Sequence, residues 1–436
     1  MTRRLTPVTR RLTPEWRPVA AAAPPAPAIS PRPGLAVVDP AALALPLSPE
    51  LAAAAAKLES ACTRCGACAA RCAFLQEYGL PGDIAAALQA GRCGTEPFAC
   101  SLCQLCGAVC PEELEPGAMF LAMRRQAVAR RAVNLRPYRP LLTYEKLGNS
   151  HLLAWQRLPA GCRRVFFPGC ALPGSRPEST LALYRRLRKE IPDLGIALAC
   201  CAKPSHDLGR QQHFQREFGQ IRKRLLAAGV EEVLAACPNC HKVFSQYGGE
   251  LKVTSVWEVL AEEGRAKPEA ADSAMAEKAA GQGEAAASAD SGGETKPAGP
   301  VVTVHDPCPL RGQPELRGAV RRLLASQGLE VREMKASGGK TLCCGEGGAV
   351  GLVRPDLAAN WGRMRSCQAE KMAVVTYCAG CAGFLQRAGL APIHLADLLR
   401  DPAAALAGQL PVAKSPWTYL NRLRLKISLM TSRSRV

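Results

Sequence analysis

Short apolar runs alternate with longer segments of helical periodicity through the last two-thirds of the chain. Runs at 163–167, 195–199 and 231–236 each lead into cysteine, and so do runs at 301–304, 341–342 and 373–376. Segments with helical spacing, such as 208–228 and 358–371, separate them. Strands that alternate with helices predict α/β units with mainly parallel sheets. Ligands bind beyond the carboxyl ends of such strands, which is where these cysteines fall.

The two sets of runs repeat each other. Counterpart cysteines lie 138 to 143 residues apart, and a nearly constant offset predicts a duplicated unit. We therefore expect one unit at 160–261 and a second at 301–400. Between them, residues 262–300 contain no Leu, Ile, Val or aromatic residue. This composition predicts a solvated, disordered linker.

The N-terminal third has a different pattern. Residues 1–48 are rich in Pro, Ala and Arg and predict a disordered arm. Helical periodicity at 49–59, 83–90 and 116–131 predicts a small helical domain over 49–135. At the other end, 401–436 is a basic tail in which Leu423, Leu425, Ile427 and Leu429 alternate, a pattern that predicts a strand.

Two cysteine runs with the spacing C-x2-C-x2-C-x3-C lie in the helical domain. This spacing binds bacterial four-iron clusters, and in two-cluster ferredoxins the fourth cysteine of each run ligates the other cluster. Zinc sites favour separated ligand pairs, often with histidine, and no histidine precedes His151. We therefore predict two [4Fe-4S] cubanes, one held by Cys62, Cys65, Cys68 and Cys110 and the other by Cys100, Cys103, Cys106 and Cys72.

Composition limits the cellular compartment and the partners that we expect. The 21 cysteines are clustered at ligand spacing and not scattered as disulfide partners, which predicts a reducing cytoplasm. Anionic clusters offset part of the net charge of +19, and no segment interleaves Lys and Arg with aromatic residues, so we expect no nucleic-acid partner. The twin arginines near the N-terminus precede no apolar stretch of the kind found in an export signal.

The duplicated units resemble a known family. Cys170, Cys200-Cys201 and Cys237-x2-Cys240 in one unit, and His305-Asp306-Pro307-Cys308, 343–348 and Cys378-x2-Cys381 in the other, are similar to the paired CCG domains of heterodisulfide reductase catalytic subunits. With ferredoxin runs in front, the arrangement also resembles the iron-sulfur subunits of glycolate, lactate and anaerobic glycerol-3-phosphate oxidoreductases. The resemblance covers about residues 55–395. The expected fold class is α+α/β: a helical two-cluster ferredoxin-type domain followed by two duplicated α/β CCG units.

The resemblance implies that five cysteines in each unit hold a noncubane four-iron cluster at which a disulfide is split. The first set is Cys170, Cys200, Cys201, Cys237 and Cys240, and the second, catalytic set is Cys308, Cys343, Cys344, Cys378 and Cys381. From the residues alone, five thiolates can bind more metal than one tetrahedral ion needs, while a cysteine pair that cycles through a disulfide is the alternative.

The two units are not equal. Ala202 stands where the second unit has Gly345, and glycine permits positive φ or a close backbone approach. Alanine therefore constricts the first site or changes its loop, so we expect one or two noncubane clusters. His206, His241 and His305 lie beside predicted ligands; they orient ligands or relay protons, with His305 and Glu346 as the candidates for a relay. Cys93, Cys162 and Cys367 are predicted to be small buried hydrophobes.

These patterns predict an iron-sulfur oxidoreductase subunit in which two cubanes relay electrons to the CCG sites, where a disulfide-type acceptor is reduced. The alternative is the electron-transfer subunit of a flavin-dependent 2-hydroxyacid or glycerol-3-phosphate dehydrogenase that feeds quinone. A third interpretation is a structural or redox-sensing module. No G-x-G-x-x-G follows a strand, so we expect no flavin on this chain and a flavoprotein or membrane cytochrome as partner. The expected location is cytoplasmic, with peripheral association of the basic tail with the inner membrane face as an alternative role.

Overall fold

The computed structural model describes residues 37–43, 45–263 and 299–431. Most of the predicted arm (1–48) and linker (262–300) lies outside the described residues. Where the end of the arm is described, Val37 and Val38 are buried and donate their backbone N–H groups to Glu96 Oε2 at 3.0 and 3.1 Å. Residues from Val37 onward form one compact unit.

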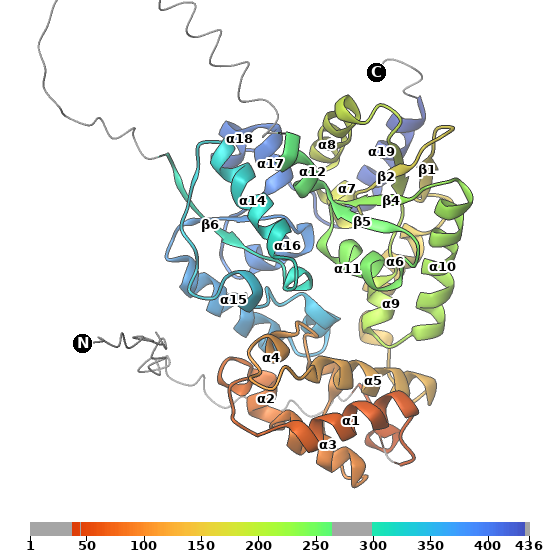
Figure 1. Cartoon of the computed structure of the whole chain (residues 1–436), viewed down its shortest axis with the longest axis vertical. Coiled ribbons are helices and arrows are strands. Elements are labelled where there is room, and N and C mark those ends of the chain that lie inside the picture. The colour runs from red at the N-terminus through yellow and green to blue at the C-terminus, as the bar shows by residue number, and fades with distance from the viewer. Residues whose placement is uncertain (1–36, 44, 264–298, 432–436) are drawn as a thin grey trace, which may run out of the picture. The chain divides into compact units, whose positions relative to one another are not determined.

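A helical domain occupies one end of this unit (Figure 1). Its first helix begins where Ser48 Oγ accepts the Leu51 N–H and Pro49 takes the first helical position, both common N-terminal signals. The helices predicted at 49–59, 83–90 and 116–131 are confirmed as α1, α3 and α5. The helices are α1 (Pro49–Ala61), α2 (Ala73–Tyr78), α3 (Pro81–Gln89), α4 (Leu105–Ala108), α5 (Pro116–Ala129) and α6 (Arg139–Gly148).

The first α/β unit is built on a five-stranded sheet with the order β1-β3-β2-β4-β5. Only the edge strand β1 is antiparallel; the other pairs are parallel, as predicted. The strands are β1 (Trp155–Arg157), β2 (Arg164–Phe167), β3 (Gly195–Leu198), β4 (Glu232–Ala235) and β5 (Lys252–Ser255). The helices are α7 (Ala171–Ser175), α8 (Pro177–Glu190), α9 (Lys203–Asp207), α10 (Gln211–Ala227), α11 (Pro238–Tyr247) and α12 (Val256–Glu263).

The second unit has a four-stranded parallel sheet with the order β7-β6-β8-β9. Its strands are β6 (Val301–His305), β7 (Glu330–Val331), β8 (Ala373–Thr376) and β9 (Pro392–His394). Its helices are α14 (Pro314–Ser326), α15 (Pro355–Ala369), α16 (Ala379–Arg387), α17 (Leu395–Arg400) and α18 (Pro402–Leu406).

The strand predicted at 341–342 was wrong. Strand β7 pairs with β6 as β3 pairs with β2, but it ends at Val331, and an irregular loop connects it to Cys343. Two apolar residues before a cysteine pair are too few to specify a strand, and buried Leu342 packs in a small apolar cluster with Trp361. The second unit therefore brings its cysteine pair into place by a loop, where the first unit uses a strand.

The strand predicted in the tail was also wrong, because the segment forms helix α19 (Trp417–Thr431). Its buried residues are Arg422, Leu425 and Leu429, at spacings of three and four, whereas Ile427 is exposed. Residues four apart lie on one face of a helix as well as on one face of a strand, so the alternating pattern fits both. Packing of Leu425 and Leu429 on one side therefore selects the helix. Helix α19 packs against α7 and α8.

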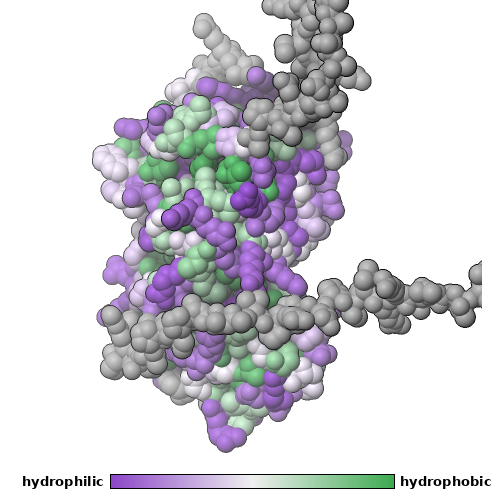
Figure 2. Space-filling model, turned by 90° about the vertical axis from the view of Figure 1, so that its left-hand side faces the viewer, coloured by the Kyte–Doolittle hydropathy of each residue, from purple (hydrophilic) through white to green (hydrophobic). Residues whose placement is uncertain are grey.

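One apolar core joins the two α/β units. It includes Leu183 and Trp257 of the first unit, Val304 and Leu323 of the second, and Leu425 of α19. Figure 2 shows a surface on which hydrophobic and hydrophilic side chains intermingle. Within the described ranges, no helix combines the length and the hydropathy needed to cross a bilayer.

Candidate functional site

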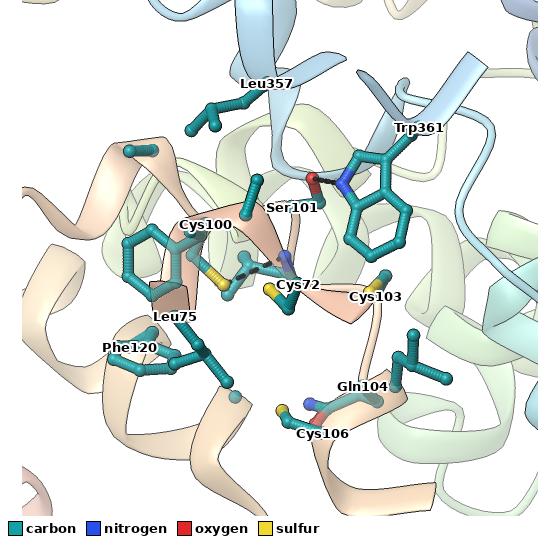
Figure 3. Close-up of a pocket in the computed structure, with 16 residues that line it drawn as sticks. Cys72, Leu75, Cys100, Ser101, Cys103, Gln104, Cys106, Phe120, Leu357 and Trp361 are labelled. Atoms are coloured by element: carbon teal, nitrogen blue, oxygen red, sulfur yellow. Dashed lines mark hydrogen bonds between the residues drawn. The ribbon is translucent and has the colours of Figure 1, made fainter. Parts of the chain in front are cut away.

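The eight cysteines of the two N-terminal runs line two neighbouring pockets. One pocket contains Cys72, Cys100, Cys103 and Cys106, closed by Phe120 and Trp361 (Figure 3). The other contains Cys62, Cys65, Cys68 and Cys110, with Cys106 at its border. The last cysteine of each run thus lies with the first three of the other run. Ala73, which replaces the proline of the second run, begins α2, and Cys72 is the residue that precedes this helix.

The first of these pockets, with Cys72, Cys100, Cys103 and Cys106, is called the inner pocket, and its thiols are strongly desolvated. Burial raises the pKa of Cys100 to about 12, and burial together with neighbouring thiols raises that of Cys72 and Cys106 further. These three thiols and the neighbouring Cys103 cannot all ionise without a compensating cation. Iron supplies that charge and binds the deprotonated form, so this donor set fits a four-thiolate cluster.

The second cysteine site consists of Cys308, Cys343, Cys344, Cys378 and Cys381. Cys308 follows β6, Cys343 and Cys344 end the long loop after β7, and Cys378 and Cys381 lie where β8 leads into α16. The imidazole of His305 lies within 4.8 Å of the Cys344 and Cys381 sulfurs, and a Glu346 oxygen is equally close to the sulfurs of Cys378 and Cys381. The site therefore lies at the carboxyl edge of the sheet.

Two buried side chains, His305 and Arg365, lie at the second cysteine site with few protein partners. Nε and Nη2 of Arg365 form no hydrogen bond within the part of the chain that the structure describes, and the partner that acts on the His305 imidazole is the Cys344 thiol. Both residues are fully buried, and an unpaired buried donor costs about 1–3 kcal/mol. Sulfur acceptors of an anionic cluster would satisfy such donors, so these residues also fit the group.

The first cysteine site consists of Cys170, Cys200, Cys201, Cys237 and Cys240. Cys170 follows β2, the adjacent pair follows β3, and Cys237 and Cys240 begin α11 after β4. The thiols contact one another, and a hydrogen bond with Cys200 lowers the pKa of Cys170 to about 7. Gly169 permits this packing, since a Cβ there would lie 3.0 Å from the Cys237 Cβ. All 21 cysteines are free thiols.

The motif alanine is accommodated without distortion of the first cysteine site. Ala202 adopts the left-handed conformation (φ 58°, ψ 22°) and immediately precedes α9. Gly345 has φ 99°, and a Cβ there would lie 2.6 Å from the Ala358 carbonyl oxygen. Alanine in the left-handed region costs about 1–2 kcal/mol but is sterically allowed, whereas Gly345 meets backbone. The two loops therefore differ in shape, and only the second one requires glycine.

The inner ferredoxin-type pocket contacts the second cysteine site directly. Cys103 packs against the small buried cluster that contains Cys343, and its interaction with the Cys343 thiol lowers the pKa of Cys103 to about 6. Arg311 Nε donates to the Cys103 carbonyl oxygen at 2.7 Å, and Trp361 Nε1 donates to Ser101 Oγ at 3.2 Å. Gly347 lies so close to this run that a Cβ there would be 2.3 Å from the Ser101 carbonyl oxygen. The second cysteine run and the second cysteine site are therefore packed directly against each other.

A carboxyl group of the second cysteine site also lies within electrostatic reach of the first cysteine site. Burial raises the pKa of Glu346 well above its usual range, and the neighbouring Cys344 and Cys237 act in the same direction. Cys237 belongs to the first cysteine site, so Glu346 lies within electrostatic reach of both. Lys203, at the start of α9, acts on Glu346 in the opposite direction.

Arg124 of α5 holds all three regions together. Its guanidinium is 0% exposed and donates to the carbonyl oxygens of Pro97 (3.0 Å), Cys100 (2.5 Å), Asp207 (2.7 Å) and Gly348 (3.1 Å). These acceptors lie at the start of the second cysteine run, at the end of α9 and in the segment after Gly345. A single buried side chain therefore links the helical domain to both CCG units.

Sequence reasoning missed the arginines of these sites. Arg124, Arg311, Arg365 and Arg422 lie in helices or turns with no motif around them. The one available signal was at Arg124, which interrupts the apolar face formed by Met119, Met123 and Ala127. The other arginines resemble ordinary surface residues until tertiary packing buries them.

The histidines and remaining cysteines have distinct environments. His206 forms hydrogen bonds of 2.9 Å with Asp207 Oδ1 and with the Tyr247 hydroxyl. His241 approaches Ser245 Oγ at 3.4 Å. Cys93 and Cys162 are buried as predicted, but the prediction for Cys367 was wrong: it lies on the outer side of α15 and is exposed.

Comparison with known proteins agrees with these groupings. A cysteine-rich domain family, CCG, matches residues 164–245 and again 302–386, and a 4Fe-4S dicluster domain matches residues 61–115. The matched segments lie within the two CCG units and the helical domain. The chain thus has one dicluster domain and two CCG domains.

Three characterised proteins are similar over most of the chain. A subunit of the fumarate reductase (CoM/CoB) of Methanothermobacter marburgensis is 28% identical, over 69% of this chain and 60% of that protein. The glycolate oxidase iron-sulfur subunit of Escherichia coli is 26% identical, over 58% of this chain and 62% of its own length. A subunit of the dihydromethanophenazine:CoB--CoM heterodisulfide reductase of Methanosarcina barkeri is 25% identical, over 66% and 73%. The chain thus spans about 60% of the length of the first two.

Proposed function

Because this chain is a CCG-domain iron-sulfur protein with a dicluster domain, related to heterodisulfide reductase and glycolate oxidase subunits, we propose that it relays electrons through two [4Fe-4S] cubanes to noncubane clusters in its CCG units. There it reduces a disulfide-type acceptor. The observation that carries this proposal is the contact between Cys103 and Cys343, which leaves no protein layer between the inner pocket and the second cysteine site.

The order of the sites supports a single direction of relay within the chain. The outer cubane belongs to Cys62, Cys65, Cys68 and Cys110, of which Cys65 is exposed, so a redox partner has access there. The inner cubane belongs to Cys72, Cys100, Cys103 and Cys106. The partner is a flavoprotein or cytochrome subunit that delivers one electron at a time.

Reduction of a disulfide requires two electrons and two protons, and it breaks one S–S bond to form two thiols. When bound, the clusters supply single electrons at low potential. Glu346 and His305 are the residues proposed to hold the protons, because both lie beside second-site sulfurs. Lys203, which forms an ion pair with Asp207, also acts on the charge of Glu346.

Iron and sulfide content of anaerobically purified protein tests the cluster assignment. We expect about sixteen irons per chain with all four sites filled and about eight with the cubanes alone. The double variant Cys343→Ser/Cys344→Ser should lose about four irons and retain the cubane EPR signals, while Cys367→Ser, an exposed cysteine outside every site, should lose none. A wild-type count near eight that the double variant leaves unchanged would contradict the proposal.

A second candidate function follows from the similarity to a glycolate oxidase iron-sulfur subunit. In that case the chain accepts electrons from a flavin-dependent 2-hydroxyacid dehydrogenase and passes them to quinone. The two functions differ in their acceptor. Viologen-driven consumption of organic disulfides by the purified chain supports the first, and 2-hydroxyacid-dependent quinone reduction with a flavoprotein partner supports the second.

A further inference from the structure

Helix α19 packs against the segment that carries Cys170. The Asn421 side-chain amide donates to the Gly174 carbonyl oxygen at 3.0 Å, and Ala413 N–H donates to the Ser175 oxygen at 3.0 Å. There is little free space at this contact, since a Cβ on Gly174 would lie 3.1 Å from the Thr418 Cβ. The C-terminal helix therefore fixes α7, the short helix that begins immediately after Cys170.

The inner side of α19 brings a cation to the first cysteine site. Arg422 is 2% exposed, its Nη2 donates to the Gly148 carbonyl oxygen at 3.1 Å, and its Cζ lies 5.5 Å from the centre of the Tyr144 ring. A Cβ on Gly148 would lie 3.0 Å from Arg422 Nη1 and 3.1 Å from the Cys200 Cβ. Only the glycine separates the guanidinium from the cysteine pair.

The guanidinium has an unused donor. Arg422 Nη1 is buried without a hydrogen-bond partner, and no ion pair joins Arg422 to a carboxylate among the residues with assigned positions. Glu145 also acts on this site, but its carboxylate accepts from Ser205 N–H at 2.8 Å and lies 3.3 Å from His213 Nε2. A buried cation that lacks a counterion is costly, so its position indicates an anion nearby.

A second unpartnered donor lies on the same side of the first cysteine site. Asn149 Oδ1 accepts the Cys200 N–H at 2.8 Å, which fixes the orientation of the amide, and its Nδ2 is buried with no partner among the described residues. Tyr144 completes this wall, with its hydroxyl 2.9 Å from the Cys170 carbonyl oxygen. A neutral disulfide between two of the thiols would supply neither negative charge nor strong acceptors for these donors.

We propose that Arg422 balances the negative charge of the cluster assigned to the first cysteine site, and that helix α19, which carries Arg422, is an integral wall of this site. This inference rests on the proposed function. It predicts that the CCG unit with Ala202 holds a cluster, and it assigns the basic tail the role of packing against this site. Arg422 acts as a positioning residue, since it holds the charge and the Cys170 segment without being a ligand.

Three variants of the full-length chain test the proposal by iron and sulfide content and by Mössbauer and EPR spectra. Arg422→Met should lose about four of sixteen irons, while the cubane signals of the same sample show that the rest of the chain is folded. Arg422→Lys keeps the charge and should retain most of the iron. The matched control is Arg424→Met on the exposed side of the same helix, which should match the wild type.

The outcomes separate this proposal from the proposed function. A wild-type count near eight irons overturns the proposed function itself. A count near sixteen that Arg422→Met leaves intact overturns only the role of Arg422. If Arg422→Met also loses the cubanes, Arg422→Gln decides the question, because it keeps N–H donors and removes the charge. A more negative reduction potential of the first-site cluster in Arg422→Gln than in the wild type supports charge balance by Arg422, and an unchanged potential refutes it.

Discussion

Replacement of Arg124 by methionine is expected to weaken the contacts between the helical domain and both CCG units, and so to lower the free energy of unfolding. The methionine side chain fills much of the space of the arginine stem but donates no hydrogen bonds. Four carbonyl oxygens, those of Pro97, Cys100, Asp207 and Gly348, lose their donor at once. The guanidinium is also positioned 4.7 Å from the Phe98 ring centre, and this contact is lost as well.

The magnitude follows from the burial of the group. A hydrogen bond to a charged group contributes about 1.5–3 kcal/mol, so four give roughly 6–12 kcal/mol. Desolvation of the buried guanidinium offsets several kcal/mol of this, and removal of one partner from a buried charged network typically costs about 3–5 kcal/mol. We expect a loss of about 3–5 kcal/mol for Arg124→Met. Arg124→Lys keeps the charge but cannot reach four acceptors, and should lose about 1–3 kcal/mol.

The neighbouring residue provides the control. Arg125 lies on the same helix and is partly exposed, with an ion pair to the exposed Glu50 and Nη2 contacts of 3.5 Å to His206 Nε2 and the Tyr247 hydroxyl. Exposed pairs contribute about 0–1 kcal/mol and contacts this long add little, so Arg125→Met should lose no more than about 1 kcal/mol. Denaturant unfolding of the anaerobic holoprotein measures the free energies. Hydrogen exchange over 97–103, 207–209 and 345–349 shows whether protection is lost at the three segments that Arg124 joins.

The same contacts connect stability to electron transfer. If Arg124 sets the position of the inner pocket against the second cysteine site, Arg124→Met should slow reduction of that site while the cubanes still accept electrons. An Arg124→Met protein within 1 kcal/mol of Arg125→Met, with unchanged exchange at the three segments, would show that the side chain does not couple the domains.

Three further perturbations probe the fold and the sites. Gly345→Ala should destabilise the protein by at least about 2 kcal/mol in thermal melts, because its Cβ meets a carbonyl oxygen, whereas Ala202→Gly should be neutral or stabilise by up to about 1 kcal/mol; equal effects would contradict the difference between the two loops. Arg176→Met, which breaks the buried ion pair with Asp397 between the CCG units, should cost about 3–5 kcal/mol in denaturant unfolding, against less than about 1 kcal/mol for Arg400→Met at the exposed pair beside it; similar losses would contradict this. Burial lowers the pKa of His394 well below 6.5, so the unfolded state takes up the proton first, and stability should fall as pH drops below 6.5, by up to about 1.4 kcal/mol per pH unit. His394→Asn keeps an acceptor for the Ala396 N–H and should remove that part of the pH dependence in parallel denaturation series at pH 7.5 and 5.5; parallel slopes for both proteins would refute it.

The sequence by itself determined the chemistry of this protein and the class of its fold. Ligand spacing is local, so the two C-x2-C-x2-C-x3-C runs and the repeated cysteine groups could be recognised without any structure. The strands at 163–167, 195–199, 231–236, 301–304 and 373–376 were found because short apolar runs before a cysteine leave few alternatives. The dicluster domain and the two CCG domains followed from these patterns.

Tertiary structure alone decided how the groups face one another. The contact between Cys103 and Cys343 joins residues that are far apart in sequence, and no local pattern encodes such a distance. Packing turned an alternating tail into helix α19, and a loop took the place of the strand predicted at 341–342. The buried arginines Arg124, Arg365 and Arg422 became visible only there, because burial of a charge depends on what packs around it and not on its neighbours along the chain.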